Sequence, residues 1–202
     1  MPDYSIENSL KEKGFKLICG VDEAGRGPLA GPVAVGAVVL PDNCEIEGLN
    51  DSKKLSEKKR EELFPIICEK ALYWSVVLID NEEIDDINIL AATIKGMKQA
   101  VYNLEVVPDY VLVDGNRLPD YDIPAQFVIK GDAKSMSIAA ASVLAKVIRD
   151  RVMVEYDKIF PQYQFSKHKG YGTKLHYEMI EKHGISPIHR KTFLKKILGD
   201  NI

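Results

Sequence analysis

Acidic residues end three apolar segments of this sequence, in a pattern that suits metal-assisted hydrolysis. Asp22, followed by Glu23, ends FKLICGVD; Asp114 lies near the end of DYVLVDG, and Asp132 ends QFVIKGD. Strand ends in an α/β sheet meet at one edge, so these carboxylates can converge there. Carboxylate oxygens suit Mg²⁺ and Mn²⁺, and clustered acids would repel one another without a cation. The alternative for each acid taken alone is a turn or capping residue.

The elements that must position these acids follow from the hydrophobic pattern. Apolar runs rich in β-branched residues predict strands at 15–22, 32–40, 72–80, 109–115 and 126–132. Helical spacing predicts helices at 56–71, 81–104, 135–158, 173–183 and 189–198, after a loose or weakly helical lead-in at 1–13. Ser56 is the expected N-cap of the first helix, and Pro65 is expected to interrupt or kink it.

This order of elements predicts the fold class and a division of the chain. Two strands followed by strands that alternate with helices indicate one mixed α/β sheet with helices on its faces. The 202 residues favour one domain that can bury enough surface to fold without a disulfide. We expect a catalytic core of residues 1–160 and a basic, helical C-terminal region of residues 161–202, with the boundary near Pro161.

The glycine-rich turn after the first acids could be mistaken for a nucleotide-binding loop. Gly25-Arg26-Gly27-Pro28-Leu29-Ala30 fits the form GxGxxA and follows a strand. A dinucleotide-binding turn must lead into a helix, whereas PVAVGAVVL has the pattern of a strand. The context therefore argues against a dinucleotide, and the glycines suit close approach of the backbone to another ligand.

Positive charge is concentrated in two segments of a chain whose net charge is −3. Segment 166–196 holds eight lysine and arginine residues against two glutamates, and segment 52–60 holds five against one. A basic third on an otherwise acidic chain indicates a polyanionic partner; the alternative is solvated helix faces. The candidates for contact with phosphate are Lys53, Lys54, Lys146, Arg149, Lys167, Lys169 and Arg190.

Cysteine usage and the N-terminal sequence point to the cytoplasm. Cys19, Cys44 and Cys68 include no CxxC pair, which predicts free thiols in a reducing compartment. The N-terminal segment lacks the apolar run of a signal peptide, and no apolar run approaches the length of a membrane span. We expect a cytoplasmic monomer without a membrane partner.

Five motifs, in this order, resemble those of bacterial ribonuclease HII, of the type 2 ribonuclease H family. They are GVDEAGRGPLAGPVAVGAVVL (20–40), NDSKKLS (50–56), VDG (113–115), KGDAKSMSIAAASVLAKVIRDR (130–151) and HKGYGT (168–173). The resemblance implies a ribonuclease-H-like fold, a five-stranded mixed sheet flanked by helices, with a small helical C-terminal region. The related ribonuclease HIII carries an extra N-terminal domain, and the short lead-in here favours HII.

The resemblance also implies an activity and its residues. It implies endonucleolytic hydrolysis of the RNA strand of RNA–DNA hybrids. It also implies cleavage 5′ of single ribonucleotides in duplex DNA, leaving a 3′-hydroxyl and a 5′-phosphate, with two Mn²⁺ or Mg²⁺ ions. Its metal ligands would be Asp22, Glu23, Asp114 and Asp132. The 25–27 turn would read the 2′-hydroxyl through its backbone, and Tyr171 would lie at the RNA-to-DNA junction. A different carboxylate-metal nuclease or phosphatase on the same fold is the alternative, and no protein partner such as a clamp can be assigned.

The remaining polar candidates are histidines and two serines at a helix start. His168 could approach the substrate, whereas His176, His183 and His189 show no metal-ligand spacing and are expected on the surface. Ser135 and Ser137 could contact phosphate or cap the helix at 135–158.

Overall fold

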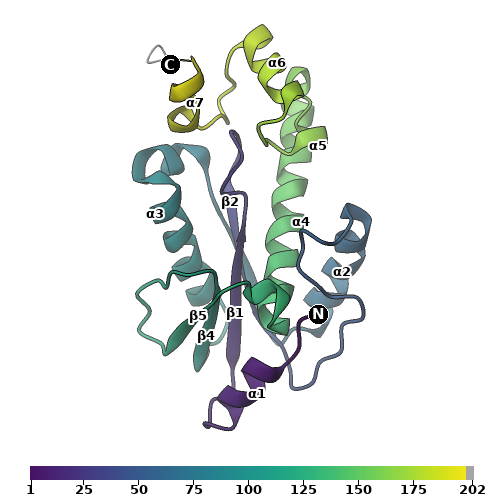
Figure 1. The fold of residues 1–202 in the computed structure, drawn as a ribbon, viewed down its shortest axis with the longest axis vertical. Helices are drawn as coiled ribbons and strands as arrows, with labels where there is room; N and C mark the ends of the chain where they lie inside the picture. The colour runs from purple at the N-terminus through teal and green to yellow at the C-terminus, as the bar shows by residue number, and fades with distance from the viewer. Residues whose placement is uncertain (199–202) are drawn as a thin grey trace.

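A computed structural model describes residues 1–198, with side chains through Lys195. One five-stranded sheet of order β3-β2-β1-β4-β5 forms its centre (Figure 1). The strands are β1 (Ile18–Ala24), β2 (Val33–Val39), β3 (Tyr73–Ile79), β4 (Tyr110–Asp114) and β5 (Ala125–Val128). The β1–β2 and β2–β3 pairs are antiparallel, and the β1–β4 and β4–β5 pairs are parallel. The expected mixed α/β sheet is confirmed.

Helices cover both faces of the sheet (Figure 1). The helices are α1 (Ser5–Lys11), α2 (Glu57–Lys70), α3 (Asn81–Tyr102), α4 (Met136–Ile159), α5 (Phe165–His168), α6 (Lys174–His183) and α7 (Lys191–Leu198). Cys19 and Val21 of β1 pack with Met97 of α3 in the core of one face. Val38 of β2 packs with α2 and with Leu144 of α4 in the core of the other face. Helices α5 and α6 lie near the C-terminal end of α4, and α7 lies on the α3 side of the sheet (Figure 1).

Small residues let α4 lie unusually close to the two central strands. A Cβ atom on Gly20 of β1 would lie 2.2 Å from the carbonyl carbon of Ser137, and one on Gly36 of β2 would lie 2.5 Å from the Ala141 oxygen. Because side chains alternate along a strand, Asp22 emerges on the same face of β1 as Gly20. The close approach therefore brings α4 alongside Asp22.

Several local expectations need correction. Helix α2 begins after its Ser56 cap as predicted but continues through Pro65. Helix α3 is interrupted at Asn88, whose φ of 67° and ψ of 161° are not helical, and the sequence pattern did not reveal this. Strand β5 ends at Val128, so Asp132 lies not at a strand end but in the 3₁₀ turn Gly131–Ala133 that leads into α4.

The helices of residues 1–198 include none with the length and apolar character needed to cross a membrane. Cys19, Cys44 and Cys68 are all free thiols, as expected.

Candidate active site

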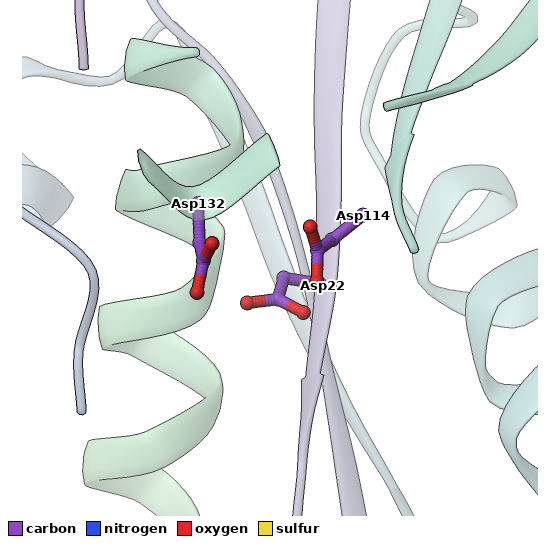
Figure 2. A group of neighbouring side chains, drawn as sticks. All are labelled: Asp22, Asp114 and Asp132. Carbon is purple, nitrogen blue, oxygen red and sulfur yellow. The ribbon is translucent and has the colours of Figure 1, made fainter. Parts of the chain in front are cut away.

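Three carboxylates from separate parts of the chain converge beside the sheet. Figure 2 shows Asp22 on β1, Asp114 at the end of β4 and Asp132 alongside α4, with their carboxylates facing a common space. One oxygen of each lies within 4.8 Å of the others. The Gly131 N–H donates to Asp114 Oδ1 at 2.6 Å, which ties the 3₁₀ turn to the end of β4. This bond explains how Asp132 joins the other two although no strand carries it there.

Burial and the repulsion of neighbouring acids make the carboxyl groups of Asp22 and Asp132 costly to ionise. Asp22 is 2% exposed and Asp132 is 5% exposed. Burial raises the pKa of Asp22 well above its usual value, Glu23 and Asp114 raise it further, and a hydrogen bond from Ser142 opposes the shift. Burial also raises the pKa of Asp132, as does Asp114. A divalent cation would relieve this repulsion, so the donor set fits a hard metal ion.

Two neighbouring residues add to the electrostatics of the site. Glu23 lies outside the group of three; its Oε1 atom is 3.5 Å from Arg26 Nη1. Burial raises the pKa of Glu23, and Arg26 acts against the rise. Lys53 Nζ lies 4.0 Å from Asp132 Oδ2. The Lys53 side chain is 77% exposed, so solvent screens its attraction to the acids.

A cavity of about 190 Å³ borders Glu23 and brings the predicted substrate-binding segments together. Lys53 lines this cavity and also a second one, which Asp114 and Asp132 line. Its lining residues are Glu23, Ala24, Gly25, Arg26, Gly27, Ser52, Lys53, Lys146 and Tyr171. The Tyr171 ring is half-exposed, and Lys146 Nζ lies 5.5 Å from its centroid. The Leu29 N–H donates to the Gly170 oxygen at 2.8 Å, which joins the segment after the glycine turn to the segment that carries Tyr171.

Arg190 does not meet the expectation of a phosphate contact. It is fully buried, and its guanidinium donates to four main-chain oxygens of the glycine-rich turn. The acceptors are Gly25 (2.7 Å), Pro28 (2.9 Å), Gly31 (3.0 Å) and Arg26 (3.1 Å). Five fixed N–H donors suit a guanidinium to this task. Arg190 therefore holds the shape of the turn from beneath.

Arg149 was also expected to contact phosphate, and the structure places it elsewhere. It is fully buried, and its donors reach the oxygens of Pro32 (2.9 Å), Lys169 (3.0 Å) and Ala30 (3.1 Å). Its hydrogen bonds thus span the segment after the glycine turn and the segment before Tyr171. Burial lowers the pKa of Arg149, because the charge is removed from water. The sequence offered no signal that separates these two arginines from surface ones.

The other basic candidates differ in how free they are. Lys53, Lys54 and Lys167 are exposed. Lys146 Nζ lies 2.7 Å from Asp150, and Lys169 Nζ lies 3.3 Å from Glu57 and donates to the Ser166 oxygen. Lys53 and Lys54 line a cavity together with Asp114 and Asp132, so they are the exposed candidates best placed for a phosphate.

The histidines and the helix-start serines were only partly predicted. His176 and His189 are 0% and 1% exposed, so the expectation that they lie on the surface is wrong, whereas His183 is exposed as expected. Ser135 caps α4 by accepting from the Ile138 N–H and donates to Glu7 Oε1 at 2.7 Å. Ser137 is also buried, which leaves neither serine open to a phosphate.

A family model described as ribonuclease HII matches residues 19–196. The chain belongs to the ribonuclease HII family. It is 58% identical over 193 residues to ribonuclease HII of Clostridioides difficile, an alignment that covers 96% of this chain and 76% of the relative. It is also 58% identical over 186 residues to ribonuclease HII of Idiomarina loihiensis, covering 91% of this chain and all of the relative.

Solved structures agree with this assignment. The RNase HII in a PCNA:RNase HII complex from Archaeoglobus fulgidus matches with a TM-score of 0.72 and 25% identity, covering 90% of this chain and 95% of that one. The protein is therefore an endoribonuclease that acts on RNA–DNA hybrids. Family membership and the carboxylate group together indicate that it uses divalent metal ions. A different nuclease or a phosphatase on the same fold is not favoured.

Proposed function

We propose that this ribonuclease HII cuts on the 5′ side of a ribonucleotide, including a single one embedded in duplex DNA, and leaves a 3′-hydroxyl and a 5′-phosphate. The observation that carries the proposal is the 190 Å³ cavity. It joins the 25–27 turn and Tyr171, and it borders Glu23, the residue after Asp22, and Lys53, which also lines the cavity of Asp114 and Asp132. A ribose held there would present its 5′ phosphate to the acids.

Two Mg²⁺ or Mn²⁺ ions would be held by Asp22, Asp114 and Asp132. In this proposal Asp22, between the other two acids, would be shared in holding the ions with Asp114 and Asp132, and Glu23 would contribute through its side chain or its carbonyl. Such a pair of ions supplies an activated water and neutralises the charge that develops on the phosphate and on the leaving oxygen. The burial of Asp22 and Asp132 gives their oxygens fixed positions for this task.

The glycine-rich turn can distinguish RNA from DNA through its main chain. In a trans peptide the C=O and the following N–H point in opposite directions. Arg190 takes the oxygens of Gly25 and Arg26 on the buried side, so the N–H groups of Arg26 and Gly27 point away from it. We propose that these N–H groups meet the 2′-hydroxyl, which DNA lacks. A Cβ on Gly27 would enter open space, which shows how accessible this part of the turn is.

Tyr171 and the lysines complete the proposed binding surface. The half-exposed Tyr171 ring lines the same cavity as the turn, where it would contact the sugar at the junction. Lys53, Lys54, Lys146 and Lys169 lie on this side of the molecule and would attract the phosphates of the duplex. The basic region 161–202, which contributes Tyr171, would then serve substrate binding while residues 1–160 supply the carboxylates.

Three duplexes that differ at one sugar test this proposal. They carry a ribose, a 2′-deoxyribose or a 2′-O-methylribose at one position. We expect cleavage only beside the ribose. We also expect Tyr171→Phe to reduce kcat/KM about tenfold or more, because the hydrogen bond that the Tyr171 hydroxyl would donate to the ribose is lost. Tyr102→Phe, on α3, is the matched control. Equal cleavage of the 2′-deoxy duplex would overturn the 2′-hydroxyl proposal, and a fully active Tyr171→Phe variant would remove Tyr171 from it.

A further inference from the structure

A cluster of three buried histidines lies directly beneath the segment that carries Tyr171. His168, His176 and His189 are 7%, 0% and 1% exposed, and none of them lines the cavity or contacts the carboxylates. The His168 and His176 rings stack with centroids 4.2 Å apart, and Phe165 packs edge-on against the His176 ring. Apolar rings would fill this space equally well, so the polar contacts that the histidines make need a separate explanation.

The hydrogen bonds assign a single proton position to His189. The Ser186 N–H donates to His189 Nδ1 at 2.8 Å, and a backbone N–H can only donate. Nδ1 must therefore carry no proton, and the Ser186 hydroxyl, 2.7 Å from the same atom, also donates to it. The proton of the neutral ring is then on Nε2, which faces His176 Nε2 at 3.0 Å.

The same reasoning passes along the cluster to Tyr171. Because His189 Nε2 donates, His176 Nε2 accepts and the His176 proton is on Nδ1. That Nδ1 lies 3.0 Å from the main-chain carbonyl oxygen of Tyr171 and donates to it. The proton position of His168 is fixed independently. The Gly170 N–H donates to its Nδ1 at 3.2 Å, so its Nε2 carries the proton and donates to the main-chain carbonyl oxygen of Tyr163 at 2.9 Å.

We propose that His189 and His176 form a directed chain of hydrogen bonds, from Ser186 to the Tyr171 carbonyl, that positions Tyr171 over the substrate cavity. His176 is thus a positioning residue that acts through Tyr171, and its role in substrate selection rests on the function proposed above for that tyrosine. A protonated His176 would place an N–H against the Nε2–H of His189, so the chain requires both rings to be neutral. Burial lowers the pKa of each to about 4, in keeping with this requirement.

The charged groups around the cluster leave this assignment in place. Beside His168, Asp157 acts to raise its pKa and Lys169 acts to lower it, while burial is the largest influence and lowers it. His183, the other histidine of α6, has an exposed side chain whose ring meets Tyr163 edge-on. His183 therefore provides a matched control on the same helix.

The first test reads the proton positions directly and does not depend on activity. Imidazole ¹⁵N chemical shifts of the unmodified protein at pH 7 distinguish an Nδ1–H ring from an Nε2–H ring. We expect Nδ1–H for His176 and Nε2–H for His189 and His168. The opposite tautomer for His176 or His189, or a charged ring, would overturn the proposed chain whatever the enzyme's activity.

The second test asks whether the chain acts through Tyr171. His176→Phe keeps a stacked ring but removes both nitrogens, whereas His176→Asn can keep a donor near the position of Nδ1. On a duplex with one ribonucleotide, we expect His176→Phe to lower kcat/KM about tenfold, the size expected for one buried hydrogen bond. We expect His176→Asn to recover most of the loss and His183→Phe to match the parent.

Combining His176→Phe with Tyr171→Phe separates positioning from a general structural effect. If His176 acts through Tyr171, the second substitution adds less than its separate factor. Fully independent factors would overturn the positioning role even with the expected tautomers. If Tyr171→Phe alone leaves kcat/KM unchanged, Tyr171 does not recognise the substrate, and the link from the histidine chain to substrate selection is refuted. The ¹⁵N shifts would still decide whether the chain of hydrogen bonds exists.

Discussion

Arg190→Lys is the substitution that most sharply tests how the glycine-rich turn is held. Three guanidinium nitrogens of Arg190 reach four carbonyl oxygens, on residues 25, 26, 28 and 31, at 2.7 to 3.1 Å. Lysine keeps the charge and much of the apolar stem. It donates from one nitrogen, however, and cannot reach oxygens distributed around a turn.

The expected loss follows from the number of oxygens left without a donor. We take two of the four oxygens as unsatisfied, at about 1–3 kcal/mol each, for a total of roughly 2–6 kcal/mol. Domains of this kind have a free energy of unfolding of about 5–15 kcal/mol, so Arg190→Lys should fold in many conditions but with reduced stability. Because the turn also binds the substrate in our proposal, kcat/KM should fall together with the free energy of unfolding.

Urea unfolding followed by circular dichroism measures the stability change, and cleavage of a duplex with one ribonucleotide measures the effect on the turn. Arg151→Lys is the matched control. Arg151 forms an ion pair with Glu61 in which the two side chains are 49% and 41% exposed, and such surface pairs contribute about 0–1 kcal/mol. If Arg190→Lys changes neither quantity more than Arg151→Lys does, the turn does not depend on these hydrogen bonds.

Three further predictions concern the charges of the carboxylate site, of Lys53 and of the buried histidines. In EDTA at pH 7 we expect Asp22→Asn to be more stable than the parent, because the raised pKa of Asp22 means that ionisation opposes folding; this advantage should shrink as the pH falls and the parent carboxyl takes up its proton. Urea unfolding between pH 5 and 8 checks the sign, and a parent that is the more stable protein would refute it. Substrate affinity should fall steeply with salt, and Lys53→Gln should reduce the slope of log K against log salt by about 1; an unchanged slope would remove Lys53 from the phosphate contacts. At pH 5.5 the ¹⁵N shifts of His176 and His189 should still be those of neutral rings, since burial lowers both pKa values to about 4.

Much of the fold could be predicted because its elements have strong periodic signals. The strands of the sheet and helices α2, α3, α4, α6 and α7 lie within a few residues of their predicted bounds. The kink at Asn88 could not be predicted, because the Asn88 side chain caps the helix that restarts there by accepting from the N–H groups of Leu90 and Ala91. Such local capping competes with a continuous helix only in its tertiary context.

The candidate site shows the same division between local and tertiary signals. The convergence of Asp22 and Asp114 follows from parallel strands whose ends share one edge. Asp132 reaches them by a different route, through the hydrogen bond between Gly131 and Asp114. Arg149 and Arg190 resemble surface cations in sequence, since only the fold shows which carbonyl oxygens they satisfy.

The position of the cut tests the central claim most directly. A duplex with one ribonucleotide, labelled at either end, is incubated with Mg²⁺ and the parent, Asp22→Asn, or Asp42→Asn as a control on an exposed carboxylate. We predict one cut, 5′ of the ribonucleotide, with a 3′-hydroxyl and a 5′-phosphate, from the parent and from Asp42→Asn, and no product from Asp22→Asn. A cut on the 3′ side, cleavage of an all-DNA duplex, or turnover of Asp22→Asn close to that of the parent would contradict the account.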